Sequence, residues 1–150
     1  MLKPGLYLKA EKYFDILETV FVILVAVSLF LMVKTVPYSV YCVTASFSLL
    51  AILYWLVAMA PNKDVPMFVK VTKKVHLMGL VLAVLSIMMK FKMDPESYSP
   101  MLIYVALVSV FAGFVMIMIS KIKFHYTVNF VSGVTRSLVY LLILLWVCAL

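Results

Sequence analysis

The chain has 150 residues, of which 67% are hydrophobic and only 13% are charged, and its formal net charge is +7. Soluble domains are about 45–50% apolar and about 25% charged, and a chain of this size cannot bury so large an apolar excess in one core. The composition therefore excludes an ordinary soluble domain and indicates an all-α integral membrane protein. Its basic residues flank hydrophobic runs, as in anchoring at lipid headgroups, so we expect the lipid bilayer and no nucleic acid as a partner.

The first two apolar runs predict a tight pair of membrane-spanning helices, at about 14–34 and 37–60. Residues 19–33 carry no charge, and transferring such a run into a bilayer is favourable. Only Lys34, Thr35 and Val36 separate the two spans, and Pro37 suits the first turn of a helix. We expect a helical hairpin whose first run is retained as a span, because it is longer than a typical signal-peptide core.

Three further apolar runs predict spans at about 74–89, 101–120 and 132–150, with a polar loop at 91–100. The last run, Ser137 to Leu150, is shorter than the roughly 30 Å hydrocarbon core at 1.5 Å per residue. It crosses only if the helix begins near Ser132 and Arg136 extends its side chain to the interface. We favour this fifth span over a re-entrant or interfacial helix. The sequence thus predicts one membrane-embedded domain, 1–150, a polytopic transmembrane helical bundle of four to five spans.

Residues 121–130 alternate polar and apolar side chains, which in a soluble protein is typical of a half-buried strand. An isolated strand within lipid leaves its backbone groups without hydrogen bonds. We therefore expect an interfacial segment with its aromatic side chains at the headgroups. The alternative is a short extended piece packed on a partner.

The distribution of basic residues predicts the orientation of the chain. If the loops alternate across the membrane, ten lysine and arginine residues fall on the side of the N-terminus and three on the other side. The positive-inside rule then places the N-terminus in the cytoplasm, and we expect a cell (inner) membrane. With five spans Cys42 and Cys148 share the outer side, and the sequence leaves their pairing open.

Few polar side chains in the spans are candidates for chemistry. Glu18 is the deepest acid, and we expect an interfacial structural role favoured by the helix dipole rather than an ion or proton site. We expect His76 and His125 to be interfacial, with a proton relay as the alternative, because no further ligands are spaced to complete a metal site. Hydroxyl groups within the spans are expected to bond their own backbone or a neighbouring helix. They belong to Thr44, Ser46, Ser48, Ser86 and Ser109.

Small residues recur at four-residue spacing in the third and fourth spans. Gly79 and Ala83 form one such pair, and Ser109 and Gly113 form the other. Small residues let the backbones of membrane helices approach closely. We expect these four residues to mark helix packing within the bundle or a docking face for a partner protein.

Taken together, these features predict no catalytic, cofactor-binding or metal-binding residue. We expect a non-enzymatic membrane protein, a small accessory or structural subunit that acts through helix–helix association with other membrane protein subunits or with copies of itself. The alternative is a small transporter or channel, including a homo-oligomeric one. A transporter needs polar side chains along a path, and an enzyme needs them clustered at one depth.

Overall fold

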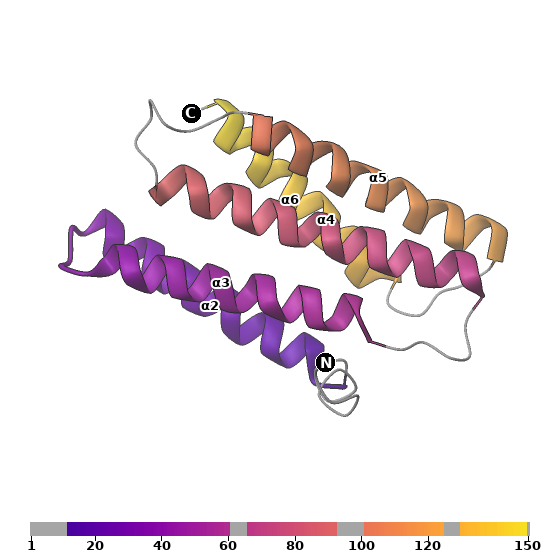
Figure 1. Ribbon diagram of the computed structural model, residues 1–150, viewed down its shortest axis with the longest axis horizontal. Helices are drawn as coiled ribbons and strands as arrows, with labels where there is room; N and C mark the ends of the chain where they lie inside the picture. The colour runs from indigo at the N-terminus through magenta and orange to yellow at the C-terminus, as the bar shows by residue number, and fades with distance from the viewer. Residues whose placement is uncertain (1–11, 61–65, 93–100, 125–129, 150) are drawn as a thin grey trace.

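The computed structural model describes residues 12–60, 66–92, 101–124 and 130–149. The helices in these ranges are α2 (Phe14–Val33), α3 (Ser39–Ala58), α4 (Met67–Lys92), α5 (Met101–Phe124) and α6 (Phe130–Ala149). All five are long and apolar enough to cross a membrane, which confirms the predicted helical bundle for the described residues. Successive helices run in opposite directions, so α2 begins and α6 ends at opposite ends of the bundle (Figure 1).

The two ends of the bundle differ in charge. We call the end at which α2, α4 and α6 begin the basic end, because most of the described lysine and arginine residues lie near it. These are Lys12, Lys70, Lys73, Lys74, Lys121, Lys123 and Arg136. In the same described ranges, the opposite end carries Lys34, Lys90 and Lys92.

The predicted hairpin between the first two spans is confirmed. The Lys34 N–H donates to the carbonyl of Phe30 at 3.0 Å, and the chain then reverses direction within a few residues. Thr35 and Tyr38 take left-handed backbone conformations, with φ of 55° and 65°. Because side-chain sterics keep right-handed helices at negative φ, α3 begins only after Tyr38 rather than at the predicted residue 37.

The helices α4 and α5 are longer than the spans predicted from hydropathy, with 26 and 24 residues. Hydropathy marks the segment within hydrocarbon, whereas lysine and methionine are good helix formers that extend a helix beyond it. The helix α4 therefore begins directly after Pro66, and α5 continues through Lys121 and Lys123. The alternative of a short extended piece is wrong for residues 121–124, which are helical, and the interfacial location of the segment stays a prediction. Residues 125–129 lie outside the described residues.

The fifth helix is long and apolar enough to be a candidate span. It begins at Phe130, earlier than the predicted residue 132, and has 20 residues. At 1.5 Å per residue it covers about 30 Å, the thickness of the hydrocarbon core. The uninterrupted helix from Phe130 therefore supplies the length that the apolar run alone lacks.

The helices form two groups in contact with each other. The helix α2 packs on α3, α3 packs on α4, and α4, α5 and α6 pack together. Figure 1 shows the α2–α3 hairpin below the other helices, with α6 passing behind α4. The core lies between these groups and within the second one, and its largest fully buried side chains include Tyr54, Leu50, Leu80, Leu144 and Val110. Because lipid tails are as apolar as leucine, close packing and interhelical hydrogen bonds must hold this bundle together.

Candidate functional site

Three charged side chains from the first and last spans meet near the basic end. We call Asp15, Glu18 and Arg136 the charged cluster. The Arg136 Nε donates to both carboxylate oxygens of Glu18, at 2.8 and 2.6 Å, and Nη2 donates to Oδ1 of Asp15 at 2.6 Å. The side chains of Arg136 and Glu18 are only 14% and 13% exposed, whereas that of Asp15 is 76% exposed. The cluster therefore joins a partly buried ion pair to a carboxylate at the surface.

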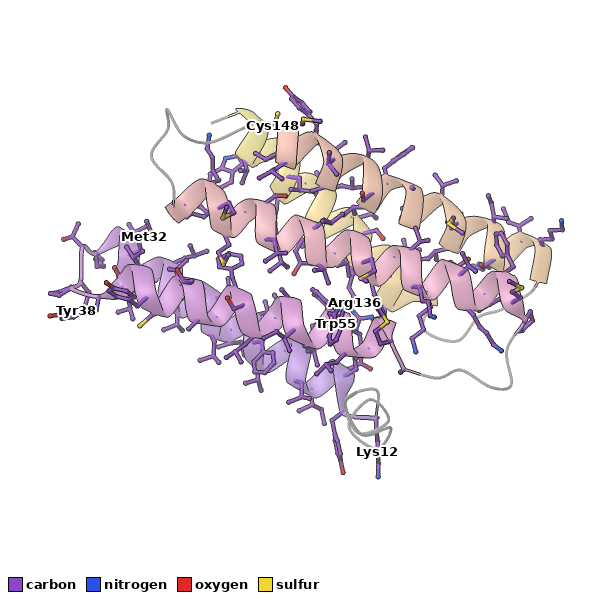
Figure 2. The ribbon with its side chains drawn as sticks, viewed as in Figure 1. Lys12, Met32, Tyr38, Trp55, Arg136 and Cys148 are labelled. Carbon is purple, nitrogen blue, oxygen red and sulfur yellow. The ribbon has the colours of Figure 1, made fainter. Side chains whose placement is uncertain are left out.

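The helical spacing explains why these residues meet. Asp15 and Glu18 are three residues apart, so they lie on one face of α2. At 1.5 Å per residue, Glu18 lies about 6 Å and Arg136 about 9 Å from the start of its helix, and both helices start at the basic end. The Arg136 guanidinium also lies 4.5 Å from the centre of the Phe14 ring, a cation–π contact. Figure 2 shows Arg136 where the α2–α3 hairpin faces the other helices.

Two tyrosines extend the charged cluster into the core. The Tyr54 hydroxyl donates to Oε1 of Glu18 at 2.7 Å, and its oxygen lies 3.1 Å from that of Tyr140. Because Tyr54 gives its one proton to the carboxylate, Tyr140 is the donor in the second bond. Tyr140 is one helical turn beyond Arg136, about 15 Å from the start of α6. A chain of hydrogen bonds thus leads from exposed Asp15 to a buried residue at mid-span.

His76 lies buried beside this chain, with 6% of its surface exposed. Its Nδ1 is 3.3 Å from Oγ of Ser137, the residue after Arg136, and Ser137 also donates to the carbonyl of Gly133 at 3.0 Å. Because the Ser137 proton goes to that carbonyl, Nδ1 is the donor to Ser137, and Nε2 is left as a bare acceptor. Nε2 is buried and has no hydrogen-bond partner within the described part of the chain.

The charged cluster joins α2 to a helix whose backbone does not pack against it. Within the described ranges, the backbone of α2 packs on α3, and that of α6 packs on α4 and α5. Arg136 bridges this separation, and Tyr54 of α3 joins the same carboxylate. In a low-dielectric setting, each buried charge is tolerated because its partner and its hydrogen bonds compensate it. The charged cluster and Tyr54 thus hold α2, α3 and α6 together.

The small residues identified in the sequence lie where α4 and α5 pack. A Cβ added to Gly79 would be 2.9 Å from the carbonyl oxygen of Ser109, and one added to Gly113 would be 2.8 Å from the Cα of His76. Both distances are too short for a real side chain, so the two backbones approach as closely as glycine allows. Ala83, one turn beyond Gly79, is fully buried. At Gly79 and Gly113 the space beside the backbone is therefore filled by the neighbouring helix of the same chain.

The hydroxyl groups behave as predicted. Thr44, Ser46, Ser86 and Ser109 each donate to a carbonyl four residues earlier in their own helix. Hydroxyl groups also form hydrogen bonds between helices, which adds attraction where hydrophobic driving force is lacking. Among them are Ser28 with Ser46 at 2.9 Å, Ser48 with Sδ of Met88 at 3.8 Å, Thr72 with Ser120 at 3.0 Å, and Ser86 with the carbonyl of Leu102 at 3.0 Å.

Several site predictions require correction. The side chain of Arg136 was expected to extend freely toward the interface, but it is held by Glu18 and Asp15 of α2. His76 is buried inside the bundle, because α5 packs over it at Gly113, whereas its depth in the membrane stays a prediction. Sequence reasoning also missed Tyr54 and Tyr140. The available signal was that Glu18 and Arg136 are opposite charges within two turns of helix starts on the same side of the membrane. His125 lies outside the described residues.

The remaining candidates are the two cysteines. Cys42, in the first turn of α3, and Cys148, near the end of α6, are free and exposed at the opposite end of the bundle. No group of three histidine, cysteine, aspartate or glutamate side chains in the described residues is placed to hold a metal ion.

The fold and this site define a multi-pass helical integral membrane protein with a charged cluster inside the bundle. No protein-family model matches the chain, and neither curated proteins nor solved structures gave a match. Any more specific function must therefore be argued from the geometry.

Proposed function

We propose that the protein is a non-enzymatic accessory or structural subunit of a membrane complex, acting through lateral association of its helices. The observation that carries this proposal is the charged cluster, in which the buried charges are engaged with one another. Glu18 of α2 accepts three hydrogen bonds, one from Tyr54 of α3 and two from Arg136 of α6, and these hold α2 in place. Because these ionisable residues are paired with one another, we assign them a structural role and infer that the protein functions through the outer surfaces of its helices.

The exposure of α2 supports the same proposal. Its span is only 11% buried inside the molecule, compared with 44% for α3, and Ser28 is its one buried residue. Its outer face carries large apolar side chains such as Ile23, Val27 and Phe30. A helix held so firmly by its first turns, with most of its circumference open to the membrane, is suited to contact another membrane helix.

Photo-crosslinking tests this proposal in the native membrane. A photoreactive amino acid is introduced at Val27 of α2, Val108 of α5 or Leu142 of α6, which are 50%, 65% and 68% exposed. A subunit docked through one face gives a protein adduct of a single mass at some of these positions and lipid adducts at the others. Lipid adducts at all three positions, or adducts containing only a second copy of the chain, would contradict the proposal.

A second candidate function is proton-coupled transport, and one observation favours it. His76 has a bare Nε2 in the core and lies next to hydrogen-bonded residues that run from Asp15 to Tyr140. Ionisable residues within membrane helices often mark ion or proton pathways. The test is proton flux into liposomes containing the purified protein. Transport predicts a flux that His76→Leu abolishes and Ser109→Ala leaves unchanged, whereas wild-type flux equal to that of empty liposomes rules transport out.

We also propose that the basic end faces the cytoplasm of a cell (inner) membrane, because positive charge is retained on that side. Cys42 and Cys148 then both face outward. A membrane-impermeant maleimide added to intact cells should label Cys42→Ser and Cys148→Ser equally well, and the double variant not at all. Labelling that requires permeabilised cells would show the reverse orientation.

A further inference from the structure

His76 is a titratable side chain that the bundle buries with one ring nitrogen unpaired. Only 6% of its surface is exposed, and Nε2 has no hydrogen-bond partner within the described part of the chain. Nδ1 lies 3.3 Å from Oγ of Ser137 on α6. Because Ser137 gives its own proton to the carbonyl of Gly133, Nδ1 carries the proton of the neutral ring. Nε2 is therefore the basic nitrogen, and the fold encloses it.

The helices α6 and α3 bring a positive charge and two hydroxyl groups to the region of His76. The elements packed against α4 are α3, α5 and α6. On α6, Arg136 precedes Ser137 in the sequence, and Tyr140 lies about one turn further along. On α3, the hydroxyl of Tyr54 is hydrogen-bonded to that of Tyr140. Neither helix contains a carboxylate within its described residues.

The helix α5 packs its backbone directly over His76. A Cβ added to Gly113 would be 2.8 Å from the Cα and 3.3 Å from the Cβ of His76. Because α5 lies this close, the ring reaches water only if the helices around it separate. The other titratable residues of these two helices add no negative charge nearby. They are Lys73 and Lys74 within one turn on α4, and Tyr104, Lys121 and Lys123 at more than about two turns from Gly113 on α5.

The carboxylates available to a protonated His76 are already engaged. The described residues contain two carboxylates, those of Asp15 and Glu18, and Arg136 donates hydrogen bonds to both. A charge buried without a partner is strongly unfavourable. Protonation of His76 therefore either leaves a bare charge in the core or draws a carboxylate away from Arg136. Both outcomes oppose the packing seen in the fold.

We propose that His76 is a proton-binding site that makes the bundle acid-sensitive, because a proton on Nε2 opposes the packing of α6 against α4. A histidine in water takes up a proton at about pH 6.5. His76 of the unfolded chain does so, whereas the folded bundle encloses Nε2, so the unfolded state binds more protons below this pH. The free energy of unfolding therefore falls as the pH falls below about 6.5. Between about pH 7.5 and 5.5 the ratio of folded to unfolded protein should fall about tenfold.

Unfolding by sodium dodecyl sulfate in mixed micelles, measured on the full chain at about pH 7.5 and 5.5, tests the proposal. The test variant is His76→Asn, whose amide can donate to Ser137 as Nδ1 does but does not titrate. The control is His125→Asn, which removes the other histidine of the chain. We expect the folded-to-unfolded ratio of wild type and control to fall about tenfold on acidification, and that of the test variant by less than about twofold.

The change with pH, rather than the stability itself, decides the result, so the space left by the smaller asparagine does not affect it. Equal pH dependence in wild type and His76→Asn would overturn the proposal, because another group would then be responsible. Wild-type stability that does not change with pH would overturn it without any variant. If His76→Asn does not fold, His76→Gln takes its place. Micelles carry no proton gradient, so the outcome is independent of whether the protein transports protons.

Discussion

Replacing Glu18 by glutamine removes one charge from the charged cluster and leaves the shape of the side chain nearly unchanged. In the wild-type protein Tyr54 donates to Glu18 at 2.7 Å, and the glutamine oxygen can still accept this hydrogen bond. Arg136, however, loses its main counter-charge. Asp15 remains near Nη2, but its side chain is 76% exposed and the ion pair it offers is weak. The substitution therefore isolates the effect of an uncompensated guanidinium between α2 and α6.

The magnitude follows from the burial of the pair. Breaking a fully buried ion pair by removing one partner costs about 3–5 kcal/mol, whereas replacing both partners is often nearly neutral. Because Glu18 and Arg136 are only partly buried, we expect Glu18→Gln to lower the free energy of unfolding by about 2 kcal/mol, and Arg136→Met by a similar amount. The double variant should recover most of this loss. Asp15→Asn, at the exposed end of the cluster, should cost less than about 1 kcal/mol.

The assay is unfolding in mixed micelles by titration with sodium dodecyl sulfate, followed by the fluorescence of Trp55 and Trp146. A double-mutant cycle then gives the coupling energy between Glu18 and Arg136. The reasoning is refuted if Glu18→Gln costs less than about 1 kcal/mol, or if the double variant loses the sum of the two single losses. Either result would show that the pair is solvated and does not fasten α2 to α6.

Two further predictions concern packing and hydrogen bonding, and both use the same unfolding assay. Gly79→Ala should destabilise the fold by about 1–3 kcal/mol, because its Cβ meets a backbone carbonyl. Gly133→Ala, whose Cβ meets only the end of the Ile117 side chain, should be neutral or stabilising, and equal effects would contradict the assigned α4–α5 contact. Tyr54→Phe removes two hydrogen bonds and should cost about 1–2 kcal/mol, whereas Tyr140→Phe removes one and should cost about half as much. The reverse order would contradict the assignment of two hydrogen bonds to Tyr54 and one to Tyr140.

The sequence predicted the helices well because hydropathy alone identifies segments that suit a bilayer. It placed the ends of α4 and α5 less well, since hydrocarbon thickness does not determine where a helix stops. Lys121 and Lys123 continue α5 past the apolar run, because positive charge is favourable at a helix C-terminus. The start of α3 depended on the left-handed backbone of Tyr38, which no hydropathy pattern encodes.

The charged cluster illustrates what a single sequence does not contain. Glu18 and Arg136 are 118 residues apart, and either one alone resembles an interfacial charge. Their pairing depends on α3 and α4, which pack on each other and on α2 and α6 respectively, and so bring these two helices together. His76 is similar, because its burial results from the close approach of Gly113 on another helix. The periodicity of a sequence identifies the apolar face of a single helix. It does not show which helices, far apart in the sequence, come into contact in the folded protein.

Native mass spectrometry of the protein ejected from its own membrane tests the accessory-subunit proposal most directly. The proposal predicts the 17.0 kDa chain bound to a different membrane protein at a fixed ratio. A mass of 17.0 kDa alone, or simple multiples of it, would contradict the proposal and leave transport by the chain or its homo-oligomer as the function to test.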